Sequence, residues 1–237
     1  MSNKYSQGHL ERAAGKVKAS IDAADIAFVD GGAGNDLITQ ISEGLVAAGF
    51  EVGDMLEIHN APDSDNNGIY PILAVAVGQI DIPTGSLASE MTAGSSIKLK
   101  AAYPGSFRHM YFNSQLDIYT GDRPATPNHA ETGTLLVSFF GVKFGDAVWD
   151  TTALEAAIDL FAATVLSATA VAGGQAAWYR LRGGGVTTTG ASTTAPRVDG
   201  KVGVGTGDLR VASTTVATGD PASVSSLKYT FKMTPSS

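Results

Sequence analysis

The sequence contains no cysteine among its 237 residues. Disulfide bonds, thiolate metal sites and cysteine nucleophiles are therefore excluded. No apolar run is long enough to cross a bilayer, because the longest, residues 153–172, is interrupted by Glu155 and Asp159. Residues 1–16 also lack the apolar segment of a secretory signal. We expect neither a leader peptide nor a contact with a membrane.

Motifs that identify catalytic sites are missing as well. The four histidines form no H-E-x-x-H motif, and the chain contains no G-x-S-x-G sequence. The run Gly183–Gly185 lacks the G-K-[ST] ending of a phosphate-binding loop. Distance along the sequence does not exclude a triad assembled from remote residues. With no motif to support one, we expect no enzymatic activity and no catalytic residue.

Two short segments resemble parts of calcium-binding loops. Residues 31–39 fit the G-G-x-G-x-D nonapeptide, but there is one copy, without the stacked neighbour that completes the site. Residues 63–68 fit the first half of an EF-hand loop, but Ala74 stands where the bidentate acid belongs. Ordinary turns explain both segments, and we expect no metal ion or other cofactor.

Charge is unevenly distributed along the chain. Residues 1–20 carry a net charge of +3 and the whole chain −7, which leaves −10 for the remainder. An acidic body does not suit direct binding of nucleic acid, which needs a basic surface. The sequence predicts a basic N-terminal arm, residues 1–24, that is mobile in the free protein. The two alternatives are a frayed terminus and an arm that orders on a partner.

An arm that orders on a neighbouring subunit needs apolar contacts as well as charge. Ordering about 20 residues costs on the order of 20 kcal/mol, whereas an exposed ion pair returns only about 0.2–1 kcal/mol. Both kinds of side chain are present in the arm. The residues that we expect to bind a partner are Lys4, Tyr5, Leu10, Arg12, Lys16, Val17, Lys18 and Ile21.

From Asp25 onward, short apolar segments alternate with Gly, Pro, Asn and Asp, the pattern of β-strands joined by turns. Residues 37–49 fit either a brief helix or a strand and turn. The capping-box spacing of residues 152–155, with apolar residues at helical intervals up to Val165, predicts one short helix. We expect a mainly β fold with two small antiparallel β-sandwich or barrel domains, residues 25–102 and 103–237, which meet near Tyr103–Ser106.

Several motifs occur in order along the chain. In the first domain they are G-F-x-V-G-D at residues 49–54 and N-N-G-x-Y at residues 66–70. In the second they are Y-T-G-D-R-P-A at residues 119–125, T-G-T-L-L at 132–136, A-A-W-Y-R at 176–180 and R-V-D-G-K-V-G at 197–203. Each set resembles a small β-rich module of tailed-bacteriophage virion proteins. Together the two resemblances cover most of residues 25–233.

The resemblance implies a non-enzymatic structural component of a virion, assembled in the cytoplasm of the bacterial host. Our first hypothesis is a capsid decoration or cement protein, a homo-oligomer that contacts the major capsid protein. A neck, tail or fibre component, in contact with other neck or tail proteins, is the alternative of the same class. A host-glycan-binding module is a third possibility, which exposed aromatic rings at Tyr103, Tyr111, Trp149 or Trp178 would favour.

Overall fold

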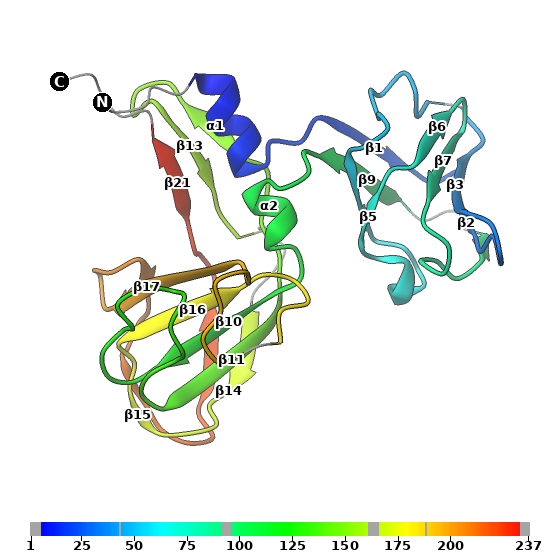
Figure 1. Cartoon of the computed structure of the whole chain (residues 1–237). Coiled ribbons are helices and arrows are strands. Elements are labelled where there is room, and N and C mark those ends of the chain that lie inside the picture. The colour runs from blue at the N-terminus through cyan, green and yellow to red at the C-terminus, as the bar shows by residue number, and fades with distance from the viewer. Residues whose placement is uncertain (1–5, 43, 92–95, 161–165, 188, 233–237) are drawn as a thin grey trace. The chain divides into compact units, whose positions relative to one another are not determined.

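The computed structural model describes residues 6–42, 44–91, 96–160, 166–187 and 189–232 (Figure 1). Strands make up 41% and helices 7% of the structure, and most strands are antiparallel, which confirms the mainly β class predicted from the sequence. The chain divides into two compact units. Unit 2 is residues 15–109; unit 1 combines the described residues before Gly15 with those from Met110 onward. No helix of the described residues is long and apolar enough to cross a membrane.

Unit 2 contains two antiparallel sheets. The first sheet has the order β1-β9-β4-β5 and the second β6-β7-β3-β2-β8. Only two residues separate β1 from β2 and β5 from β6, so the chain passes directly from one sheet to the other on two sides. The strands are β1 (Ala19–Ala23), β2 (Ile26–Val29), β3 (Asp36–Gln40), β4 (Met55–His59), β5 (Ile69–Pro71), β6 (Ala74–Ala76), β7 (Gln79–Ile82), β8 (Glu90–Met91) and β9 (Ile97–Ala102).

The interior of unit 2 is filled by side chains at alternate strand positions. Phe28 and Ile38 face each other across β2 and β3, and Ile80 continues the row on β7. All three are buried in the same apolar cluster, as the period of two in a half-buried strand requires. A short 3-10 helix, η1 (Ser64–Asn66), lies between β4 and β5, and helix α2 (Phe107–Met110) follows β9.

Unit 1 is organised around a five-stranded sheet of order β11-β10-β16-β17-β18. Its strands are β10 (Ser114–Tyr119), β11 (Leu135–Val142), β16 (Trp178–Arg182), β17 (Arg197–Gly203) and β18 (Leu209–Arg210). Two ribbons of two strands each complete the sandwich-like part. They pair β14 (Leu166–Thr169) with β20 (Pro221–Val224), and β15 (Gly174–Gln175) with β19 (Thr215–Val216).

A third sheet of unit 1 has the order β12-β13-β21 and packs against helix α1 (Gln7–Ala14). Its strands are β12 (Val148–Asp150), β13 (Glu155–Ile158) and β21 (Tyr229–Lys232). Leu10 and Ala14 on the helix are buried with Ala147 and Ala156, and Trp149 and Phe231 pack against this cluster. The i, i+4 spacing of Leu10 and Ala14 gives the helix its buried face.

The helix expected after Thr152 is not present, which corrects that prediction. Residues 151–154 form a turn in which Asp150 Oδ1 accepts hydrogen bonds from the amides of Thr152 and Ala153. Residues 155–158 form β13, which pairs with β12 on one side and β21 on the other. Pairing on both sides outweighs the helical pattern of a short segment. The later part of the expected helix, residues 161–165, lies outside the described residues.

The expectation of a mobile arm at residues 1–24 is also wrong for the residues that the structure describes. Residues 7–14 form α1, and residues 19–23 form β1, which pairs with β9 along its whole length. The arm was predicted because its residues have no strand pattern, but the buried side chains of Leu10 and Ala14 already provide a helix with a packing face. Residues 6–23 are therefore part of the folded body.

Candidate interaction site

One face of the five-stranded sheet carries a buried ion pair. The Arg180 guanidinium has no solvent exposure, and its Nε and Nη2 each donate to a carboxylate oxygen of Asp199 at 2.7 Å. Its Nη1 donates to the His129 carbonyl at 2.9 Å and to Glu131 at 3.0 Å. Burial disfavours the charged form of Arg180, but Asp199 and Glu131 outweigh it and raise the pKa. The pair with Asp199 joins β16 to β17, and the contacts of Arg180 with His129 and Glu131 hold the loop of residues 120–134 against the sheet.

A second buried pair lies beside the first. Arg182 pairs with Asp117, whose side chain is fully buried and also accepts hydrogen bonds from Ser138 at 2.6 Å and Gln115 at 2.8 Å. On the same face, Trp178 stacks on Tyr119 with ring centroids 4.6 Å apart. This face of β10 and β16 is thus occupied by internal contacts.

Unit 2 holds a comparable cluster around Glu57. The Glu57 carboxylate accepts two hydrogen bonds of 2.6 Å from Arg108, and His59 Nε2 lies 3.2 Å from it. Glu57 and Arg108 are each 1% exposed. Burial alone would raise the pKa of Glu57, but His59 and Arg108 lower it below its ordinary value. The cluster connects β4 to α2 and stabilises the fold.

The two segments that resemble calcium loops are held by protein contacts. Asp36 is fully buried, and its carboxylate accepts hydrogen bonds from the amides of Gly31, Ser86 and Leu87. The side chains of Asn66 and Asn67 bond to the backbone of Ala88 and Ala61. Within the described ranges, no group of three or more His, Asp or Glu is placed to hold a metal ion.

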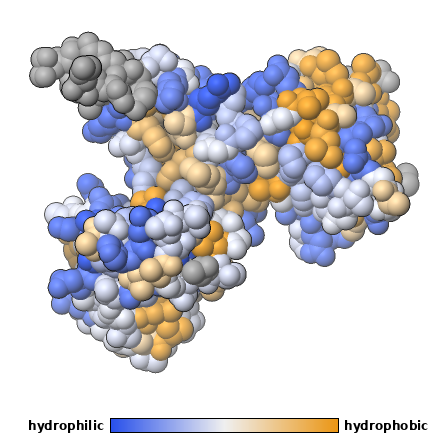
Figure 2. Space-filling view, viewed as in Figure 1, coloured by the Kyte–Doolittle hydropathy of each residue, from blue (hydrophilic) through white to orange (hydrophobic). Residues whose placement is uncertain are grey.

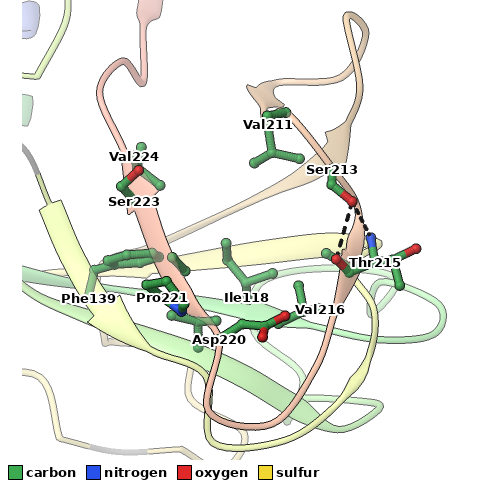
Figure 3. A pocket seen from close by; sticks show the side chains of 14 residues that line it. Ile118, Phe139, Val211, Ser213, Thr215, Val216, Asp220, Pro221, Ser223 and Val224 are labelled. Atoms are coloured by element: carbon green, nitrogen blue, oxygen red, sulfur yellow. Dashed lines mark hydrogen bonds between the residues drawn. The ribbon is translucent and has the colours of Figure 1, made fainter.

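A cavity of about 340 Å³ lies on the other face of the five-stranded sheet (Figure 3). Its floor is apolar and includes Ile118, Val137 and Phe139, which are at most 5% exposed. Its two walls are the segments 211–216 and 220–224, which are joined by a turn and stand apart above the floor (Figure 3). The volume falls within the range of about 300–1,000 Å³ found for ligand sites.

The walls of the cavity are strand edges, and no strand of the described residues lies between them. The walls include β19 and β20, which follow each other directly in the chain, yet each pairs with a different strand, β15 or β14. A hydrogen bond from the Asp220 amide to the Ala217 carbonyl closes the turn between them. Beyond this turn the two strands diverge rather than form a hairpin (Figure 3).

The direction of the backbone groups at these edges follows from the ladders. The Ala170 amide donates to the Asp220 carbonyl, so the carbonyls of Ala222 and Val224 also point towards β14. Hydrogen-bonding direction alternates along a strand, and the N–H and C=O of Ser223 therefore point away from β14, towards the cavity. The Pro221 carbonyl points the same way.

The opposite edge is already occupied by a side chain. The Ala176 amide donates to the Thr214 carbonyl, so the backbone groups of Thr215 point away from β15. The Ser213 hydroxyl accepts from the Thr215 amide at 3.1 Å and donates to the Thr215 carbonyl at 3.2 Å (Figure 3). Ser213 thus takes the place of a neighbouring strand on this side, and the free backbone edge is that of β20.

The sequence-predicted partner-binding residues are not brought together at this cavity. Leu10 and Ile21 pack in two different apolar clusters, and Lys18 pairs with Glu51 and Asp54. Arg12, Lys16 and Val17 are half-buried or exposed, and Lys4 and Tyr5 lie outside the described residues. Whether any of them binds a partner stays a prediction. The cavity residues 211–224 gave no sequence signal, because a run of Val, Ser, Thr and Ala has no spacing that marks a site.

The aromatic side chains that would favour a glycan-binding module are largely enclosed. Trp178 and Tyr111 are 1% and 3% exposed, and Trp149 packs against the α1 cluster. Tyr103 is half-buried. Comparisons with protein-family models, curated proteins and solved structures find no match for this chain.

Proposed function

We propose that the chain is a structural component of a tailed-bacteriophage virion, and more narrowly a decoration or cement protein that binds the capsid surface as an oligomer. A neck, tail or fibre protein is the alternative within the same class. The proposal begins from the resemblance of the two sets of motifs to phage virion modules.

The observation that carries the proposal is the use of the motif residues inside the fold. Asp54 of the G-F-x-V-G-D motif is buried and accepts a hydrogen bond from Lys18 at 3.0 Å. Asn66 and Asn67 of N-N-G-x-Y hold loop backbones, and Asp199 of R-V-D-G-K-V-G pairs with Arg180. These side chains fix turns and strands, which suits a durable assembly part better than a reacting site.

Exposed apolar side chains give the proposal a second, weaker support. Figure 2 shows apolar residues on the surface of unit 2 around β6 and β7. Ile41 and Val77 are 86% and 64% exposed, and the hydrogen bond from the Gln40 amide to the Gly78 carbonyl brings their segments together. Exposed apolar surface of this kind is typical of protein–protein contacts.

The test is the protein composition of particles. Tailed phages are purified from the organism that encodes this chain, and its copies per particle are counted by quantitative mass spectrometry with labelled peptide standards. Hundreds of copies support a shell protein, whereas about five, six, twelve or a few dozen copies indicate a closed ring in the neck or tail. If the chain is absent from particles but abundant in the infected cell, the proposal is wrong. Host proteins of similar abundance serve as the control for contamination.

A further inference from the structure

We propose that the cavity of unit 1 is a binding site for an extended peptide segment of another protein, which adds as a strand to the free edge of β20 and carries a basic residue beside Asp220. The proposed site lies within a single chain, and the proposal does not depend on whether the protein is part of a virion. The occupant follows from the backbone groups, the shape and the charge of the site.

The backbone edge of β20 defines the hydrogen bonds available to the peptide. Ser223 presents both an N–H and a C=O towards the cavity, and Pro221 presents a C=O alone because proline has no N–H. An antiparallel segment uses the Ser223 pair in full and donates one further N–H to Pro221. Strand addition of this kind obtains affinity from main-chain bonds and specificity from alternate side chains.

The floor of the cavity selects the side chains that point inward. Ala222 and Val224 line the cavity, and Val224 is buried, so this side of β20 faces the floor. Peptide residues opposite Ala222 and Val224 share this direction because opposite residues of a ladder lie on the same face. They meet the apolar Ile118 and Phe139 and are therefore expected to be small and apolar.

The charge of the site gives the peptide its polarity. Among the described residues that line the cavity, Asp220 alone is charged, and it lies at the closed end (Figure 3). Its Oδ2 accepts a hydrogen bond from the Ala217 amide at 2.8 Å, and no described cation pairs with it. A lysine or arginine of the peptide, opposite Asp220, would provide a positive charge to pair with its carboxylate.

These constraints define a probe, Ac-Val-Thr-Ala-Thr-Lys-NH2. Its valine lies opposite Val224, its first threonine opposite Ser223, its alanine opposite Ala222 and its lysine opposite Asp220. One control peptide replaces the first threonine by proline, which removes the N–H that donates to Ser223. A second control replaces the lysine by glutamate.

Binding is measured on the ¹⁵N-labelled full chain by following amide resonances during titration with each peptide to millimolar concentration. The expected result is a saturable shift confined to residues 213–224 and the neighbouring β10 and β11. The proline peptide produces no saturation, and the glutamate peptide binds more weakly. Shifts that are absent, scattered over both units, or equal for all three peptides overturn the proposal.

Two variants of the cavity and one control variant distinguish this site from other uses of the cavity. Asp220→Asn retains an acceptor for the Ala217 amide and weakens binding of the lysine peptide by about two- to fivefold, the range of an exposed ion pair. Asp122→Asn, an exposed residue of unit 1 outside the cavity, is the matched control and leaves the affinity unchanged. Ala222→Leu places three additional carbon atoms between β20 and the floor, where an inward side chain of the peptide would lie, and abolishes binding, with its folded state checked by the unchanged resonances of unit 2 and of β16.

The other occupants give different results in the same experiment. If an oligosaccharide such as N-acetylchitotriose shifts residues 213–224 while the peptides do not, the cavity is a saccharide site and the proposal is wrong. If the resonances of residues 213–224 in particular depend on protein concentration in the absence of peptide, the edge binds a second copy and the proposal of a different protein is wrong. A failed peptide titration would not change the number of copies counted in particles, and absence of the chain from particles would not change the peptide titration. The two proposals can therefore be refuted separately.

Discussion

Removal of the Asp199 carboxylate tests the role of the buried charges in unit 1. Asp199→Ala leaves Arg180, which has no solvent exposure, with Glu131 and the His129 carbonyl as its remaining partners. Breaking a buried pair on one side typically costs about 3–5 kcal/mol, because the other charge stays desolvated. Since Glu131 remains, we expect a loss at the lower end, about 3 kcal/mol of the free energy of unfolding.

The chain provides a probe that is specific for this unit. Its two tryptophans, Trp149 and Trp178, both belong to unit 1, and the Trp178 ring lies 5.5 Å from the Arg180 guanidinium. Urea unfolding followed by tryptophan fluorescence therefore reports on unit 1. For an m-value of about 2 kcal/mol/M, the expected loss lowers the urea midpoint by about 1.5 M.

Two further variants make the prediction a graded series. Asp199→Asn keeps the size of the side chain but loses the charge, and we expect an intermediate cost. Glu131→Gln keeps an acceptor near Arg180 in a side chain that is 11% exposed, and we expect a cost of about 1 kcal/mol. If Asp199→Ala is no more destabilising than Glu131→Gln, the buried pair does not carry the stability that its geometry indicates.

Three other predictions follow from the packing. Gly133 and Gly185 have similar positive φ angles of 76° and 74°, but a methyl group at Gly133 would meet the Thr120 carbonyl, whereas a methyl group at Gly185 would meet open space. In urea unfolding, Gly133→Ala should therefore lower the free energy of unfolding by more than about 2 kcal/mol, and Gly185→Ala by about 1 kcal/mol. Leu10→Ala should lower the calorimetric midpoint of unit 1 through a loss of about 2 kcal/mol, and an unchanged midpoint would return α1 to the role of a passive arm. The pKa of Glu57 is depressed below 4.5 in the fold, so its stabilisation is complete above that pH and is lost as the pH falls through the depressed value. The protection of the amides of residues 55–59 against hydrogen exchange, taken relative to the intrinsic exchange rate at each pH, should therefore fall more steeply in acid in the wild type than in Glu57→Gln, and parallel pH profiles of this protection would contradict the prediction.

The sequence predicted strands correctly where the alternation of apolar and polar residues is strong. The prediction failed where pairing with remote strands determines the secondary structure. Residues 116–119 and 135–142 are apolar segments of the kind that predicts strands, and they lie in β10 and β11. Leu154 and Ile158 have a helical spacing, but Ala156 and Ile158 are also two residues apart, as in a strand, and both are buried in β13. Single-sequence periodicity cannot choose between these interpretations, because the neighbours β12 and β21 come from remote parts of the chain.

The turn at Asn67-Gly68 shows the same limit at a smaller scale. An Asn-Gly pair between two strands predicts a tight turn with positive φ angles. In the structure, Asn67 has a φ of −78° and follows η1, while the positive φ of 62° occurs at Asn60. The Asn67 side chain bonds the backbone of Ala61 and so closes a longer loop. Side-chain bonds of this kind depend on the three-dimensional path of the loop, which composition does not reveal.

The candidate site was hidden from sequence analysis for a related reason. In a sequence, two arginines at alternate positions such as Arg180 and Arg182 suggest the exposed face of a strand, since charged residues are seldom buried without a partner. Their partners Asp199 and Asp117 lie on other strands, so the face is buried and polar. The cavity on the opposite face exists because β19 and β20 follow each other in the chain but pair with other strands. No residue type in a sequence indicates that two neighbouring strands will not pair with each other.

The side chains of β16 explain why a peptide is expected to bind over only one of the two faces of the five-stranded sheet. Its alternation directs Arg180 and Arg182 to one face and Tyr179 and Leu181 to the other. On the first face, ion pairs hold the loop of residues 120–134 in place, and a ligand that displaced it would have to break buried charge contacts. On the second face, the described residues that line the cavity form no ion pair that an incoming segment would have to break, and the exposed Ser223 backbone exchanges its hydrogen bonds with water for bonds to that segment. Because binding in the cavity avoids the cost of breaking buried charge contacts, the cavity is favoured as the place where unit 1 accepts another chain.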